Sequence, residues 1–349
     1  MNNIYTSTQV WTLAITAIVA LIITFALGFP LIPALRRLRF GQTILDIGPA
    51  WHKAKDGTPT MGGFMFIIGI TAAFSLGMFM LWREGALRFV DGGDTQLFNA
   101  ISGFIMALCF GFMGFLDDWI KVCKKRNKGL SVNQKLFLQV FIVAAYFTSR
   151  FIANDKGTSV YFPFMGELNL WYFYYIVMGL GIIYIVNAVN ITDGVDGLCG
   201  SVTVVYCAAF MLICGVLSLS ELSVLAAATA GGCIGFLIWN FNPAKVFMGD
   251  TGSLFLGGIV CALGVGSRYE VVMVIAAAVF IWEALTVLIQ TTYFKITGGK
   301  RLFKMTPIHH SFEMRGWKET KIVGVFSLIG TIFGTIAVLL VILEFGRWM

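Results

Sequence analysis

The sequence predicts an all-α integral membrane protein with ten transmembrane helices. Of its 349 residues, 58% are hydrophobic and only 12% are charged, whereas a typical soluble domain carries about 25% charged residues. Apolar runs long enough to cross a bilayer, roughly 20 residues each, recur along the chain. The sequence shows no separate soluble domain and no low-complexity tract. We therefore expect one polytopic membrane domain over residues 1–349.

Ten apolar segments are the candidate spans. The first follows a polar start without a basic region and is too long for a signal-peptide core, so we expect it to be retained. The eighth is short and rich in glycine, which suggests a tilted or partly interfacial helix. The segments cover residues 10–35, 61–82, 98–116, 132–153, 170–187, 200–217, 222–239, 253–267, 271–292 and 322–345.

Basic residues are divided unevenly between the two sides of this predicted bundle. When the loops are assigned alternately, 19 of the 25 Lys and Arg residues lie on, or at the border of, one side, and six lie on the other. The positive-inside rule places the basic side in the cytoplasm and both termini outside. All three histidines and every loop rich in polar motifs then face the cytoplasm, which predicts a single catalytic or binding face there.

Charge and cysteine content exclude two classes of protein. The net charge of +7 could indicate nucleic-acid binding, but the basic residues cluster beside the spans and not on a soluble domain. The seven cysteines form no CxxC pair and lie mostly in apolar runs. We therefore expect no disulfide framework and no zinc site, and we interpret the cysteines as small core residues.

Two adjacent acids, Asp117 and Asp118, stand at the end of the third apolar run. Lys121 lies four residues after Asp117, a spacing that places both on one helix face, and Lys125 follows within a basic run. Carboxylates suit Mg²⁺ and lysines suit phosphates. In the simpler interpretation the acids only end a helix and the basic run only flanks the membrane.

Two further cytoplasmic segments combine glycine with polar side chains. Residues 55–63, which include Lys55 and Thr60, precede the second span and could present backbone N–H groups to an anion, or form an ordinary turn and N-cap. Residues 187–197 carry four polar side chains three apart and two Asp-Gly turns. These four side chains and the first turn glycine are Asn187, Asn190, Asp193, Asp196 and Gly194.

The later loops add an acid, an aromatic ring and two histidines. Asp250 lies between glycines, and Phe247 three residues earlier could stack on a planar base or anchor the loop. His309 and His310 are adjacent, and because the other ligand candidates are hard oxygens, hydrogen bonding to phosphate fits them better than metal binding. Within the ninth span, Glu283 and Gln290 share a face and either line a cleft or bond to another helix.

Together these loops are suited to phosphoryl chemistry with Mg²⁺, because metal and lysines neutralise phosphate charge while oxygens react in line. A peptidase fits poorly, since neither a Ser-His-Asp nor an HExxH pattern is evident. A lipid-linked transporter would place acids along the spans and on both faces. Glu283 is the only acid in the middle of a predicted span, which argues against transport.

Six segments carry a resemblance to a known family. They are GTPTMGG at 57–63, GFLDDWIKV at 114–122, KKRNKGL at 124–130, NITDGVDGL at 190–198, FNPAKVFMGDTGSL at 241–254 and RLFKMTPIHHSFEMRGW at 301–317. In combination the sequence resembles the phospho-N-acetylmuramoyl-pentapeptide-transferases of the polyprenyl-phosphate N-acetylhexosamine-1-phosphate transferase superfamily. The alternative is a sister enzyme that uses another UDP-amino sugar.

The resemblance implies a homodimeric enzyme of the bacterial plasma membrane with ten spans, outside termini and a Mg²⁺ cofactor. It implies transfer of phospho-MurNAc-pentapeptide from UDP-MurNAc-pentapeptide to undecaprenyl phosphate, a membrane lipid, with release of UMP and formation of lipid I. This is a step of peptidoglycan synthesis, and hence of cell-wall biogenesis, cell shape and cell division. No nucleic acid is expected as a partner.

The resemblance also assigns roles to residues. Asp117, Asp118 and Asp250 match the catalytic acids, with Asp250 and Asp118 as metal ligands. The matching motif usually has three histidines, but this chain has Ser311 at the third position. The substrate-binding set is Lys55, Thr60, Lys121, Lys125, Asn190, Asp193, Gly194, Asp196, Asn240, Phe247, Gln290, His309 and His310.

Overall fold

The computed structural model describes residues 6–37, 55, 57–87, 95–124 and 128–345. Within this part of the chain, ten helices are long and apolar enough to cross a membrane, as predicted. They are α1 (Ser7–Arg37), α2 (Gly63–Arg83), α3 (Thr95–Cys123), α4 (Val132–Ile152), α5 (Phe173–Thr192), α6 (Leu198–Val216), α7 (Ser220–Asn240), α8 (Gly249–Gly266), α10 (Ala278–Ile296) and α12 (Glu319–Phe345). Two short helices, α9 (Glu270–Ala276) and α11 (Ile308–Glu313), and one hairpin, β1 (Ser159–Phe162) and β2 (Gly166–Asn169), complete the described elements.

The eighth span differs from its predicted character. It begins at Gly249, four residues before the predicted start at residue 253, and it is the most completely buried of the ten spans. Its principal neighbours are α3 and α5. Small residues allow close approach of helix backbones inside a membrane bundle, so the glycines that suggested an interfacial helix instead fit a helix at the centre of the bundle.

The predicted ninth span, residues 271–292, is two helices. α9 ends at Ala276 and α10 begins at Ala278, and Ala277 between them has φ −86° and ψ 11°. Residues 270–296 contain neither glycine nor proline, so the usual local signals for a helix break are absent from this segment.

A two-stranded antiparallel hairpin separates α4 from α5. Its register pairs Ser159 with Asn169 and Phe162 with Gly166. The hairpin is attached to the end of α12, because the carboxylate of Glu344 accepts hydrogen bonds from the Tyr161 hydroxyl and from the Phe164 amide, the latter at 3.0 Å. Sequence periodicity did not predict these short strands.

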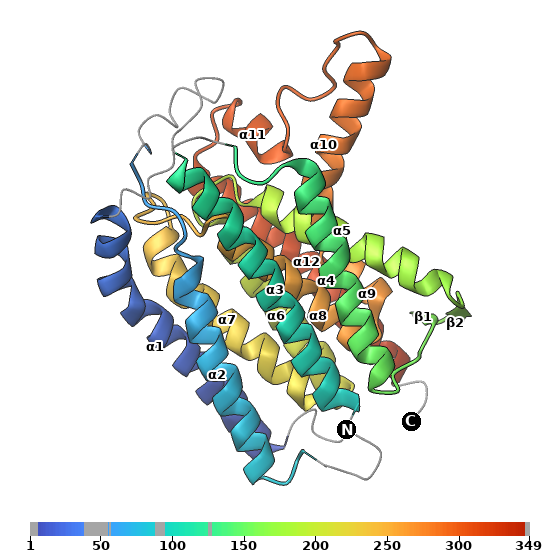
Figure 1. Ribbon diagram of the computed structural model, residues 1–349. Coiled ribbons are helices and arrows are strands. Elements are labelled where there is room, and N and C mark those ends of the chain that lie inside the picture. The colour runs from blue at the N-terminus through green and yellow to red at the C-terminus, as the bar shows by residue number, and fades with distance from the viewer. Residues whose placement is uncertain (1–5, 38–54, 56, 88–94, 125–127, 346–349) are drawn as a thin grey trace.

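The two ends of the bundle differ in content. Figure 1 shows the hairpin toward the lower right, where it contacts the end of α12, whereas α11 and the C-terminal end of α10 lie on the upper side. The end of α3, the end of α5 and the start of α8 meet on the side of α11. This upper end therefore brings together residues from helices that are far apart in the sequence.

Candidate active site

Three carboxylates meet where α3 ends and α8 begins. α3 continues past the predicted end at residue 116 to Cys123, so Asp117 and Asp118 lie in its last turns. Oxygen atoms of Asp117, Asp118 and Asp250 lie within 4.8 Å of one another. Asp117 and Asp118 are almost wholly buried, and Asp250 is partly exposed. The structure thus assembles the three acids that the sequence predicted as a set.

Asp118 joins the two helices through the first turn of α8. Its carboxylate accepts hydrogen bonds from the amide of Thr251 at 2.9 Å, the hydroxyl of Thr251 at 2.8 Å and the amide of Asp250 at 3.3 Å. The first N–H groups of a helix have no partner within the helix and attract negative charge. Gly249 makes this approach possible, because its φ is +70° and a Cβ there would lie 2.5 Å from Asp118 Oδ2.

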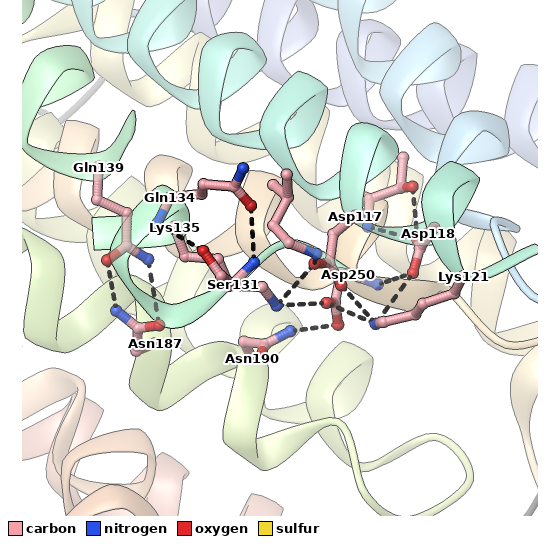
Figure 2. Close-up of polar contacts among 12 residues, drawn as sticks. Asp117, Asp118, Lys121, Ser131, Gln134, Lys135, Gln139, Asn187, Asn190 and Asp250 are labelled. Carbon is pink, nitrogen blue, oxygen red and sulfur yellow. Dashed lines mark hydrogen bonds and ion pairs between the residues drawn. The ribbon is translucent and has the colours of Figure 1, made fainter. Parts of the chain in front are cut away.

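Two lysine ammonium groups lie among the carboxylates (Figure 2). Lys121 Nζ is 2.6 Å from Asp117 Oδ2 and 2.9 Å from Asp250 Oδ2, so the predicted four-residue pairing on α3 is present. Lys135 Nζ is 3.1 Å from Asp117 Oδ1 and 3.3 Å from Asp250 Oδ2. Two cations therefore offset part of the negative charge of the three acids.

Lys135 was not among the predicted site residues. It lies in the first turn of α4, whose start is fixed by a capping box between Ser131 and Gln134. This S-x-x-Q pattern is visible in the sequence and predicts a helix start. It does not predict that α4 returns toward the end of α3, which is what brings Lys135 to the acids.

The polar residues at the end of α5 contact two different groups. Asn190 Nδ2 donates to Asp250 Oδ1 at 3.0 Å and to Ser253 Oγ at 2.8 Å, so Asn190 belongs to the acid cluster. Asn187 instead exchanges two hydrogen bonds of 3.2 Å with Gln139 of α4 (Figure 2). Of the two predicted neighbours, only Asn190 touches the carboxylates.

A second polar group surrounds Asp196. Lys55 Nζ lies 2.6 Å from Asp196 Oδ1 and 2.8 Å from Glu319 Oε2. Burial alone would lower the pKa of Lys55, but hydrogen bonds and the charges of these two carboxylates outweigh burial and raise it. The other Asp196 oxygen accepts from Asn242 Nδ2 at 3.2 Å and from the Ala244 amide at 3.0 Å. Sequence reasoning missed Glu319, an isolated acid at the start of the last span.

Asp193 and Asn240 lie beside these groups. Burial, together with the charges of Asp250, Asp118 and Asp196, raises the pKa of Asp193 to about 8. Asn240 is buried and braces the turn, because its Oδ1 accepts from the Gly197 amide at 3.1 Å and its Nδ2 donates to the Val246 carbonyl at 2.9 Å.

The anion interpretation of residues 57–63 is wrong for its paired glycines. The amides of Gly62 and Gly63 donate to the carbonyls of Phe247 and Met248 at 2.8 and 3.0 Å, so these N–H groups are occupied. The Phe247 amide in turn donates to the Pro59 carbonyl at 2.8 Å. This exchange fixes the backbone on either side of Phe247 and leaves its ring half-buried.

The two histidines of α11 occupy different environments. His309 is wholly buried, with Nδ1 3.0 Å from Glu283 Oε2, whereas His310 is partly exposed, with Nδ1 2.5 Å from Glu313 Oε2. Their ring centroids are 4.2 Å apart. Ser311 does not face outward, because its hydroxyl donates to the Met305 carbonyl at 2.6 Å and accepts from the Met305 amide at 3.1 Å.

The remaining predicted residues are placed as follows. Gln290 holds the loop before α11, since its Oε1 accepts from the amides of Leu302 and Phe303, both at 3.0 Å. Within the described part of the chain, the Gln290 side chain bonds to this loop and not to a second helix. Thr60 is buried beside Gly249. Lys125 lies outside the described residues.

Comparison with known proteins identifies the class. Residues 100–268 match the model of glycosyl transferase family 4. This segment runs from α3 to the end of α8 and contains all three carboxylates, so fold and site define a polytopic membrane transferase.

Full-length relatives narrow the class. The chain is 42% identical over 334 residues to a phospho-N-acetylmuramoyl-pentapeptide-transferase of Clostridioides difficile, covering 94% of this chain and 98% of the relative. It is 39% identical over 346 residues to one of Desulforamulus reducens, covering 98% of both chains. A third, of Listeria monocytogenes, is 40% identical over 336 residues, 96% of this chain and 99% of the relative. The chain belongs to the phospho-N-acetylmuramoyl-pentapeptide-transferase family.

Proposed function

We propose that this protein transfers the phospho-MurNAc-pentapeptide group from UDP-MurNAc-pentapeptide to undecaprenyl phosphate, releasing UMP and forming lipid I. The observation that carries the proposal is the meeting of three carboxylates with Lys121 and Lys135 at one end of the span bundle. Family membership along nearly the whole chain supports the choice of sugar and lipid.

The reaction exchanges one phosphoanhydride bond for another. An oxygen of the lipid phosphate attacks the phosphorus that carries the sugar, and a new P–O bond joins the two phosphates. The bond from this phosphorus to the oxygen shared with the uridine phosphate breaks, and UMP leaves with that oxygen. A phosphate monoester, whose second pKa is about 6, is already largely ionised at neutral pH, so direct attack needs little help from a base. Lys121 and Lys135 would bind and neutralise the phosphates.

The donor set at the end of α3 fits Mg²⁺. Three carboxylates offer hard oxygen ligands within 4.8 Å of one another, and two ammonium groups already lie against them. Asp250 and Asp118 would hold the ion. When bound, Mg²⁺ supplies charge neutralisation at the diphosphate. Asp250, the most exposed of the three acids, is the better placed for a ligand shared with substrate.

The nucleoside would bind between the Asp196 group and Phe247. The half-buried ring of Phe247 is available for stacking on uracil, and Lys55 and Asp196 would provide charged and polar groups. Asn190, Asp193 and Gly194 would form the adjacent wall toward the acids. His310, which is partly exposed, would meet the substrate from α11.

The cellular location and orientation of the protein can be inferred from the distribution of its basic residues and from its family. We infer that the site faces the cytoplasm of a bacterial plasma membrane, that both termini lie outside and that the protein acts as a homodimer. The excess of basic residues in the loops at the site end supports the orientation.

A transfer assay with two donors tests the proposal. Purified chain is mixed with undecaprenyl phosphate, Mg²⁺ and radiolabelled UDP-MurNAc-pentapeptide or UDP-GlcNAc, and label in the lipid phase is compared with UMP released. We expect matched lipid label and UMP from the muramoyl donor alone, and neither product from the Asp250→Asn variant. Transfer from UDP-GlcNAc instead would assign a sister enzyme. No transfer by monodisperse protein would overturn the proposal.

A further inference from the structure

Each histidine of α11 is paired with its own glutamate. The partner of His310 is Glu313 in the same short helix, whereas the partner of His309 is Glu283 on the spanning helix α10. Both side chains of the His309–Glu283 pair are 0% exposed. A buried carboxylate from a distant helix therefore controls which way the His309 ring faces.

We propose that Glu283 is a positioning residue of the transferase that holds His309 as the neutral tautomer with its proton on Nδ1. The proposal rests on the transfer reaction inferred above. Nδ1–H donates to Glu283 Oε2, and the hydrogen bond at one ring nitrogen sets the state of the other. Nε2 then carries a lone pair in place of a proton.

Burial supports the neutral form. Among the residues that the structure describes, His309 Nε2 has no hydrogen-bond partner and no exposure, and Glu283 Oε1 likewise has neither. A proton on Nε2, in the other neutral tautomer or in the imidazolium, would be a buried donor without an acceptor. The tautomer with Nδ1–H places the single ring proton where an acceptor exists.

The held ring supports the turn that carries Asp193 and Asp196. A Cβ built on Gly194 would lie 2.3 Å from His309 Nε2 and 2.8 Å from its Cε1, so ring and turn are in direct contact. The backbone of Gly194 is not in the left-handed region, so glycine is required here by space and not by φ. The wholly buried His309 ring thus supports the proposed substrate-binding turn at Gly194 without being exposed itself.

The same ring supports the histidine that can reach a ligand. The partly exposed His310 packs edge-on against His309, with an interplanar angle of 64°. Through the His309 ring, Glu283 therefore positions both the Gly194 turn and the His310 ring. The two histidines, which the sequence presents as equivalent, have different roles. His309 positions its neighbours, and His310 contacts the substrate.

Nitrogen NMR of histidine side chains reads the tautomer directly. The chain has three histidines, so ¹⁵N labelling of histidine alone gives few signals, and His309→Asn assigns the one in question. We expect wild-type His309 to show a protonated Nδ1 and an unprotonated Nε2. In Glu283→Leu the Nε2–H form should appear. A wild-type signal for Nε2–H or for imidazolium, or an unchanged signal in Glu283→Leu, would overturn the proposal.

Kinetic measurements on two variants of Glu283 test whether the tautomer matters for the reaction. Glu283→Leu should lower kcat/KM for the sugar nucleotide by about 10- to 100-fold, by analogy with carboxylates that orient metal-bound histidines. Glu283→Gln should lose less, because its amide oxygen can still accept the Nδ1 proton. Wild-type kcat/KM in a Glu283→Leu protein with an altered tautomer would remove the positioning role.

A matched control separates this role from the general cost of changing a buried acid. Glu270 is 2% exposed and accepts a 2.7 Å hydrogen bond from Tyr174 at the opposite end of the bundle. Glu270→Gln should leave the His309 signals unchanged. If Glu283→Leu does not fold, the wild-type spectrum decides, and a wild-type His309 signal for Nε2–H or for imidazolium contradicts the proposal. If no sugar nucleotide is a substrate, the spectra still test the tautomer by itself.

Discussion

Replacing Asp118 by asparagine should loosen the attachment of α8 to α3 as well as impair turnover. The carboxylate accepts three hydrogen bonds from the first turn of α8, at 2.8, 2.9 and 3.3 Å. A hydrogen bond to a charged group contributes about 1 kcal/mol more than a neutral one, so the loss of charge costs about 3 kcal/mol. Removing a negative charge from a helix N-terminus adds about 0.5–1 kcal/mol. Relief of the burial of the Asp118 charge and of its repulsion by Asp250 offsets about 2 kcal/mol.

The net destabilisation of Asp118→Asn is therefore about 1.5–2 kcal/mol, which corresponds to a thermal midpoint lower by about 2–3 °C for a chain of 349 residues. The measurement is thermal unfolding of purified protein in detergent, with turnover assayed well below the midpoint. Thr251→Val is the matched control, since it removes one of the three hydrogen bonds and should cost about 1 kcal/mol.

Asp250→Asn gives the contrast, because within the described part of the chain the Asp250 carboxylate accepts from the side chains of Lys121, Lys135 and Asn190 and not from a backbone amide. It should abolish turnover with a smaller change in midpoint. If Asp118→Asn unfolds within about 1 °C of wild type, the hydrogen bonds to α8 do not stabilise the fold as reasoned from the magnitudes above.

Three further results are expected. Phe247→Ala should weaken UMP binding by about 1–3 kcal/mol in calorimetry, the range for an aromatic ring stacked on a base, and unchanged affinity would make Phe247 a loop anchor. Ser311→Ala should lower the thermal midpoint more than it lowers turnover, because it leaves a buried N–H and C=O without their partner, at about 1–3 kcal/mol; a loss of turnover equal to that of a histidine variant would give the serine a chemical role. In a background without native cysteines, an impermeant thiol reagent added to intact cells should label a cysteine at Met165, in the hairpin, and not one at Lys128; the reverse pattern would invert the orientation.

The sequence predicted the parts of this protein that depend on local pattern. Ten spans follow from hydropathy, and the Lys121–Asp117 ion pair follows from helical spacing. The three acids were recognised as a set because each stands in a distinctive motif at the same predicted membrane surface. Their common location is confirmed by the way α3 and α8 meet.

The parts that the sequence did not predict depend on tertiary packing. Lys135 and Glu319 are single charged residues near span borders, and only the path of the chain brings them to the site. The amides of Gly62 and Gly63 could serve an anion as far as the sequence shows, but the 247–248 backbone occupies them. The sequence identifies no partner for Glu283, whereas in the structure α11 places His309 against it.

The central position of α8 has a consequence for how the protein is made. α3 is complete at residue 123 and α8 only at residue 266, and at about 5–20 residues per second the interval is about 7–30 s. Throughout it, the face of α3 that bears Asp117 and Asp118 lacks its main packing partner. α8 exposes little surface to lipid, so it enters a membrane in which its neighbours are already present. We expect chains arrested before residue 249 to be held by insertion factors or degraded by membrane proteases, and release of α3 into lipid to depend on synthesis of α8.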